Sequence, residues 1–191
     1  MSIYLNTDEA LENYKELTSG SSFIDKSMII QKLNNCINTP DKYICITKPR
    51  RFGKSSIINM LGAYYTKGYN SKDIFNKLNI SKSKKYLENI NNYNVINISL
   101  NKIPETGTEY SDYITMIKTY LIRDIKENYP EIETDKYFSI GDMLTATKEK
   151  FIFIIDEWDY IFSHDLFEEN QQNFLEFIRN LLKDKSYVAL G

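Results

Sequence analysis

The chain of 191 residues has only two cysteines and one histidine, and it has no excess of basic residues. Its two cysteines, Cys36 and Cys45, do not have the spacing of a metal site, so we expect a reducing, cytoplasmic setting. The single histidine, His164, lies in a polar stretch and is expected in a solvated loop. The 24 basic and 26 acidic residues give a net charge of −2, which does not support nucleic acid as a partner.

Long apolar segments are also missing from the sequence. No apolar run approaches the roughly 20 residues that span a bilayer, so we expect no membrane association. The N-terminal region carries acidic residues at Asp8, Glu9 and Glu12 and no apolar core of a leader, and it predicts no signal peptide. The length suffices for one domain with a sizeable core.

The stretch from Lys42 to Ile58 has the layout of a strand, a tight turn and a helix N-terminus. Backbone N–H groups at such a helix start have no carbonyl partner within the helix, so they can donate to phosphate oxygens. Lys54 is expected to reach the β- and γ-phosphates of a nucleotide, and the Ser55 hydroxyl to take a Mg²⁺ coordination position. Gly53 would let the chain approach phosphate without a Cβ in the way. The residues predicted to contact the nucleotide are Pro49, Arg50, Arg51, Phe52, Gly53, Lys54, Ser55 and Ser56.

The match to the phosphate-loop consensus is incomplete. The consensus has a glycine five residues before Gly53, and this chain has Lys48 there. The alternative is a helix N-terminus that happens to read G-K-S. Arg50 and Arg51 are expected either to contact phosphate, in this chain or in a neighbouring subunit, or to form surface salt bridges of little energetic value.

A second motif begins with the apolar run 151–155, which has the length of a strand. No polar residue alternates within it, so both of its faces should be covered, as in a parallel sheet flanked by helices. Asp156 follows at the carboxyl end, beside the predicted loop strand, where it could hold the hydration shell of Mg²⁺. Glu157 could orient and deprotonate a water for attack on the γ-phosphate. The alternatives are a polar strand end for Asp156 and a turn cap for Glu157.

Apolar periodicity and turn residues divide the rest of the chain into alternating elements. Strands separated by long helical stretches predict a doubly wound, mainly parallel α/β sheet flanked by helices. We expect a single domain, with 1–40 as a helical segment packed on a core formed by 41–191. Thr7 and Ser27 are expected to cap the first two helices. Helices are predicted at 7–17, 27–37, 55–66, 109–128, 137–148 and 170–183, short helical pieces between 71 and 90, and strands at 42–47, 95–100, 151–155 and 187–190.

Three segments resemble motifs of the predicted AAA-ATPase-like proteins. Residues 47–55, T-K-P-R-R-F-G-K-S, look like the family signature T-R-P-R-R-F-G-K-S, in which a basic residue already replaces the first loop glycine. Residues 23–27, F-I-D-K-S, are similar to Y-V-D-K-T, and residues 155–159, I-D-E-W-D, to I-D-E-Y-D. The resemblance implies a P-loop NTPase fold, and it would place Asp25 and Lys26 near the nucleotide base or the loop.

The resemblance also implies that C-terminal strands are missing. A full module of this type continues past its fourth strand to a sensor residue and a fifth strand. In the resembling fold the loop strand lies between the fourth and fifth strands, so 42–47 would be left as an open edge. We therefore expect a shortened chain or a domain completed by a partner.

These features together predict a domain that binds ATP and hydrolyses it with Mg²⁺. Lys54 and Glu157 would be the catalytic residues, and Ser55 and Asp156 the metal ligands. Turnover should be slow in isolation, because no sensor or arginine finger can be assigned. The alternative is a nucleotide-gated interaction module, or an inactive fragment, without useful turnover. Both leave room for a protein partner or a homo-oligomer.

Overall fold

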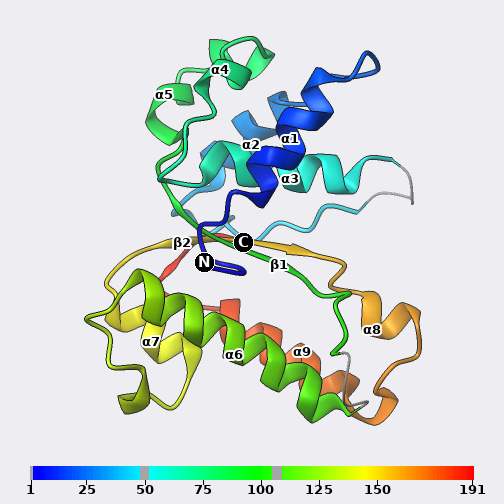
Figure 1. Cartoon of the computed structure of the whole chain (residues 1–191), viewed down its shortest axis with the longest axis vertical. Helices are drawn as coiled ribbons and strands as arrows, with labels where there is room; N and C mark the ends of the chain where they lie inside the picture. Colours follow the sequence, from blue (N-terminus) through cyan, green and yellow to red (C-terminus); the bar gives the residue numbers. More distant parts are fainter. Residues whose placement is uncertain (1, 48–51, 105–108) are drawn as a thin grey trace.

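The computed structural model describes residues 2–47, 52–104 and 109–191. Helices cover both faces of a small central sheet, giving three layers (Figure 1). The sheet contains β1 (Asn94–Ser99), β2 (Phe151–Asp156) and β3 (Val188–Leu190), in the order β1-β2-β3. Both pairings are parallel. The predicted α/β class is therefore confirmed in the form of a small, open, parallel sheet flanked by helices.

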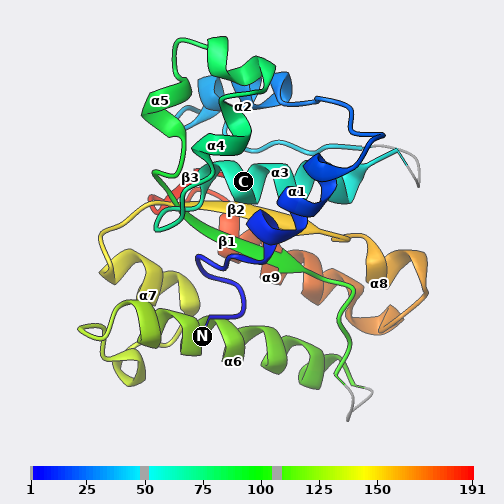
Figure 2. The same cartoon turned by 45° about the horizontal axis from the view of Figure 1, so that its top comes forward.

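The helices of the N-terminal half cover one face of the sheet, the upper one in Figure 1 and Figure 2. Alternate strand residues, such as Val95 and Ile152, point to this face because successive side chains of a strand lie on opposite sides. They pack against buried aromatic rings that include Tyr64 and Phe75. The elements on this side are α1 (Glu9–Ser19), α2 (Met28–Cys36), α3 (Lys54–Tyr65), α4 (Lys72–Phe75), η1 (Asn79–Lys82) and α5 (Tyr86–Asn89).

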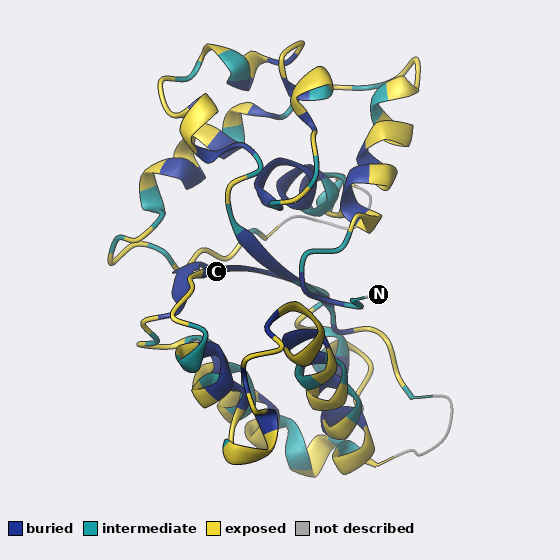
Figure 3. Ribbon diagram, turned by 60° about the vertical axis from the view of Figure 1, so that its left-hand side comes forward, coloured by how far each residue is buried: buried dark blue, intermediate teal, exposed yellow. Residues whose placement is uncertain are grey.

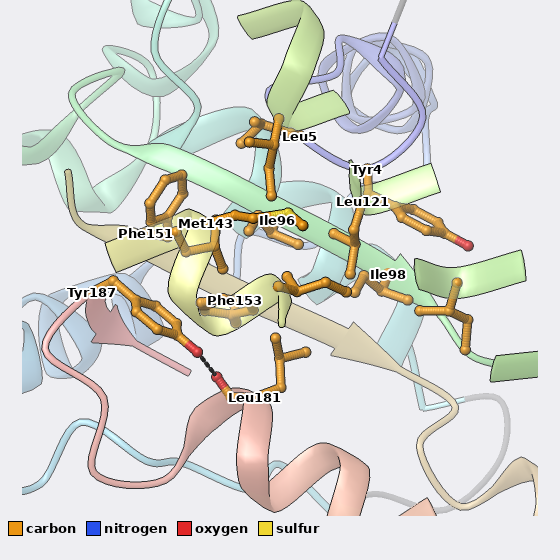
Figure 4. Close-up of a cluster of buried hydrophobic side chains, with 14 of the residues drawn as sticks. Tyr4, Leu5, Ile96, Ile98, Leu121, Met143, Phe151, Phe153, Leu181 and Tyr187 are labelled. Atoms are coloured by element: carbon orange, nitrogen blue, oxygen red, sulfur yellow. Dashed lines mark hydrogen bonds between the residues drawn. The ribbon is translucent and has the colours of Figure 1, made fainter. Parts of the chain in front are cut away.

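The helices of the C-terminal half cover the opposite face. Ile96, Phe151 and Phe153 point to this side and meet Leu121 and Met143 from two helices (Figure 4). Figure 3 shows buried residues on both sides of the sheet and exposed residues on the outer helix surfaces. The helices that follow β1 in the chain are α6 (Tyr110–Asn128), η2 (Thr134–Lys136), α7 (Ile140–Ala146), α8 (Tyr160–Ser163), η3 (Glu168–Asn170) and α9 (Gln171–Leu182).

A close helix contact holds α1 on the sheet-covering helix α3. Gly62 of α3 faces Ala10 of α1, and a Cβ added to Gly62 would lie 2.5 Å from the Ala10 Cβ. A glycine is needed here because the two helices approach more closely than any side chain would permit. The N-terminal helices thus pack directly on the helix that begins at the predicted phosphate loop.

The N-terminal segment closes the β1 edge of the sheet. Leu5 forms an antiparallel bridge with Ile96 of β1. The carboxylate of Asp124, fully buried on α6, accepts hydrogen bonds from the backbone N–H groups of Ile3, Tyr4 and Leu5 at 2.6 to 3.0 Å. Three charge-assisted bonds compensate for the burial of this carboxylate and fix the segment across the strand.

The segment 42–47, predicted as a strand, is not part of the sheet ladder. Gly191 donates to the Lys42 carbonyl at 2.9 Å, and Ile44 donates to the Gly191 carbonyl at 2.8 Å, which is a parallel pattern. The segment thus lies next to the end of β3. This position next to the fourth predicted strand agrees with the resemblance, whereas the expectation that 42–47 lies directly beside the strand ending at Asp156 was wrong.

Both predicted N-caps differ from the structure. Helix α1 begins after Asp8, not Thr7, and Asp8 makes no side-chain cap bond. Ser27 does precede α2, but its hydroxyl accepts from the backbone N–H of Ile80 at 3.1 Å and does not cap the helix. The predicted helix at 137–148 is shorter, Ile140–Ala146, because Ser139 caps it by accepting from the Asp142 N–H.

Candidate functional site

Helix α3 begins where the phosphate loop was predicted to end. Gly53 precedes it with a φ of +78°, a left-handed backbone that favours glycine. The first helical bond runs from the Ile57 N–H to the Gly53 carbonyl at 3.2 Å. The N–H groups of Lys54, Ser55 and Ser56 therefore have no carbonyl partner within the helix. The predicted contacts at Pro49, Arg50 and Arg51, together with Lys48, lie outside the described residues.

A cavity of about 510 Å³ connects the start of this helix with the end of β2. Lys54 lines it from α3, and Asp156 and Glu157 line it from the carboxyl end of β2. Thr47, the last described residue before the loop, lines it as well. The structure thus brings Lys54 together with the two acids at the strand end and with a third acidic residue, Asp159, all of them far from Lys54 in the sequence.

The acidic end of the cavity is shaped by a sharp turn after β2. Asp156 pairs in register with Ser99, and its side-chain Oδ1 accepts from the Glu157 N–H at 2.9 Å. Glu157 has a φ of +53°, which is unusual for a residue with a side chain. This left-handed conformation costs about 1–2 kcal/mol. Seven other described non-glycine residues share a positive φ, so the assignment of Glu157 to the site rests on its place in the cavity lining.

The other predicted loop residues do not line this cavity. Phe52 is 62% exposed, and Ser55, the predicted metal ligand, is exposed on the first turn of α3. Ser56 lines a separate, smaller cavity of about 130 Å³ together with Lys26. The structure therefore groups Lys54 with the two acids, and places Ser55 and Ser56 on other sides of the same helix turn.

Most of the remaining lining is apolar, and this wall was not predicted from the sequence. Helix α9 contributes Phe174, Ile178 and Leu182, and Trp158, 46% exposed, also lines it. The only advance signal was the apolar stripe of the predicted helix at 170–183, which indicates burial but not what it packs against.

The cavity lies beside the part of β2 that does not pair with β3. Pairing between the two strands extends only over Phe151 and Ile152 of β2. The remaining residues of β2 up to Asp156 have no strand neighbour on that side in the described part of the chain. Leu190 and Gly191, at the end of β3, line the cavity. The cavity therefore lies past the end of β3, between β2 and the segment 42–47.

No group of three or more His, Cys, Asp or Glu side chains that could hold a metal is found among the described residues. Mg²⁺ does not require such a cage, because it keeps several waters and binds through one or two carboxylates and substrate phosphates. A carboxylate such as Asp156 and a hydroxyl such as Ser55 are hard oxygen ligands of the type this ion prefers.

Fold and site together define an α/β protein with a charged cavity. The cavity lies between the N-terminus of α3, which follows Gly53, and the carboxyl end of the parallel strand β2. Residues 9–187 match the family model described as predicted AAA-ATPase. The chain belongs to this family, as its three motifs indicated, and the family description is compatible with nucleotide binding. No curated protein and no solved structure matches the chain. None of the described helices is long and apolar enough to cross a membrane.

Proposed function

We propose that the chain binds ATP with Mg²⁺ at the charged end of the large cavity and hydrolyses it, as a P-loop NTPase. The observation that carries this proposal is that Lys54, Asp156 and Glu157 line one cavity. A helix N-terminus with a lysine, opposed by carboxylates at a strand end, provides groups for both a polyphosphate and its divalent cation.

Phosphate binding would use the first turn of α3. Its unpaired N–H groups and the positive end of the helix dipole attract phosphate oxygens. Lys54 would add a full positive charge to the β- and γ-phosphates. Gly53, in its left-handed conformation, places no side chain of its own beside these N–H groups.

Hydrolysis would depend on the acidic turn after β2. Asp156, which lines the cavity, would hold Mg²⁺, and this ion would neutralise charge on the phosphates when bound. Glu157 would accept a proton from the attacking water, and the proton would reside on its carboxylate. Glu157 lines the cavity directly after the end of β2.

The first test is a titration of the full chain with Mg²⁺-ATP. Lys54→Ala should weaken binding by at least about tenfold, because a charge-assisted contact to phosphate is lost. Lys126→Ala, an exposed lysine of α6 on the opposite face of the sheet, is the matched control and should bind like the wild type. Equal affinity for Lys54→Ala and the wild type would refute the proposed phosphate site.

A second test separates binding from turnover. Glu157→Gln should keep Mg²⁺-ATP affinity within about threefold and reduce phosphate release by about 100-fold, the usual contribution of a general base. Glu16→Gln, an exposed carboxylate on α1, controls for the change of charge. Unchanged phosphate release in Glu157→Gln would remove Glu157 from the proposed role.

The apolar lining favours one alternative, a nucleotide-gated interaction module that binds nucleotide without useful turnover. Tyr43, Ile44 and Trp158 line the cavity and are 41%, 36% and 46% exposed, as expected where a protein partner or a second copy packs. Identification of the nucleotide that co-purifies, together with a turnover assay, distinguishes the two. Bound nucleotide without phosphate release would favour the module.

A further inference from the structure

Lys26, which lies outside the predicted loop, contacts Phe52 and Gly53, the two residues before α3. Its Nζ donates a hydrogen bond to the Phe52 carbonyl at 3.3 Å. The same Nζ lies 2.7 Å from the position that a Cβ on Gly53 would occupy. The ammonium group of Lys26 therefore fills the space that the missing side chain of Gly53 leaves open.

The backbone around Lys26 is fixed by hydrogen bonds to the first two residues of η1, Asn79 and Ile80. The carboxylate of Asp25 accepts from the Ser27 N–H at 2.8 Å and from both the backbone and the side chain of Asn79 at 2.8 and 2.7 Å. The buried Ser27 hydroxyl accepts from the Ile80 N–H. Lys26 stands between these two anchored residues, so its side chain extends to the loop from a defined position.

The carboxylate of Asp25, next to Lys26 in the sequence, forms its hydrogen bonds with other groups in the described part of the chain. Partial burial of the Asp25 carboxyl opposes its ionisation, but its hydrogen bonds outweigh that effect and lower its pKa. The Asp25 carboxylate thus accepts its hydrogen bonds from Ser27 and from Asn79 at the start of η1. The ion pairs formed between described residues do not include Lys26.

Lys26 and Lys54 lie near the N-terminus of α3 but line different cavities. Lys54 lines the large cavity with the two acids, whereas Lys26 lines the small cavity with Ser56. The region around Gly53 is therefore flanked by two lysines from separate parts of the sequence. Two flanking cations favour a ligand with several negative charges over a singly charged one.

We propose that Lys26 is a second cation of the phosphate site, which holds the Phe52 carbonyl and adds its charge to the bound polyphosphate. This inference rests on the nucleotide binding proposed above and goes beyond it by assigning a residue outside the loop. Because charge attraction grows with the charge of the ligand, Lys26 contributes more to ATP than to ADP, and least to AMP.

The test compares Mg²⁺-ATP, ADP and AMP affinities of the full chain at low and high salt. Lys26→Met should weaken ATP binding about tenfold and AMP binding less than about twofold. The salt dependence of ATP binding should decrease as well. Lys26→Arg, which keeps the charge and a donor, should restore most of the affinity. Lys32→Met, an exposed lysine of α2, is the matched control, and thermal unfolding checks that each variant is folded.

The outcomes separate this proposal from the one on which it rests. Loss of ATP binding in Lys54→Ala with wild-type binding in Lys26→Met would overturn the role of Lys26 alone. Full restoration by Lys26→Gln, which keeps a donor without a charge, would reduce Lys26 to a structural contact and also overturn it. A wild-type chain that binds no nucleotide would overturn both proposals.

Discussion

The two edges of the sheet are completed to very different degrees. At the β1 edge, the segment 3–6 lies along the strand, and the buried carboxylate of Asp124 binds three of its backbone N–H groups. Beyond β3, the segment 42–47 shares two backbone bonds with Gly191, and the side chains of Lys42 and Tyr43 bond the backbone between 182 and 188. Tyr43 and Ile44 nevertheless remain partly exposed. The comparison shows that a fully buried carboxylate closes one edge, whereas the other is held by more exposed hydrogen bonds.

The largest expected effect concerns the closed edge. Asp124→Ala leaves three backbone N–H groups without their acceptor, two of them on the buried residues Tyr4 and Leu5. We expect the free energy of unfolding to fall by about 3–5 kcal/mol, the usual cost of removing one partner from a buried charged network. Denaturant unfolding measures it, with the exposed Asp135→Ala as the control. A loss no larger than that of the control would show that the carboxylate does not hold this edge.

An intermediate effect is expected at alkaline pH. Burial, with the nearby Tyr120 and Asp124, raises the pKa of Tyr4 to about 12 from its ordinary value of 10.0. The folded chain then holds a proton that the unfolded chain releases, so this contribution is complete below pH 10 and is lost as the pH rises toward 12. Unfolding curves at pH 9.5 and 11.5 should show a smaller difference for Tyr4→Phe than for the wild type. The same difference in both chains would exclude Tyr4 as the source.

The smallest effect is expected at the edge beyond β3. Ile44 is 36% exposed, and its only backbone bond to the sheet region in the described structure goes to Gly191. Ile44→Ala should therefore lower the free energy of unfolding by no more than about 1 kcal/mol. Phe153→Ala on β2, 4% exposed, provides the contrast and should cost about 3–5 kcal/mol. A large loss at Ile44 would mean that this edge is packed more firmly than its exposure indicates.

The sequence was most informative where a single pattern decides the structure. The apolar run 151–155 has no polar alternation and forms the fully flanked strand β2, and the stripe along 109–128 forms the long helix α6. The prediction that Lys54 and Asp156 converge rested on strands of a parallel sheet ending at the same edge, and both residues line one cavity.

Long-range partners could not be predicted in the same way. Asp124 appears in the sequence as one more charge on a helix, and the backbone groups that bind it lie about 120 positions away. The segment 42–47 has the composition of a strand, but pairing requires a neighbour that its own residues do not specify. The apolar cavity wall on α9 was missed because periodicity identifies a buried face without identifying what covers it.

The left-handed backbone at Glu157 has a consequence for laboratory evolution of this chain. A library at that position selected only for folding should enrich glycine and asparagine, which adopt a φ near +53° at low cost. Selection for the proposed turnover should instead retain glutamate in spite of its conformational cost. The divergence between the two enriched populations would measure how much stability this one position gives up for chemistry.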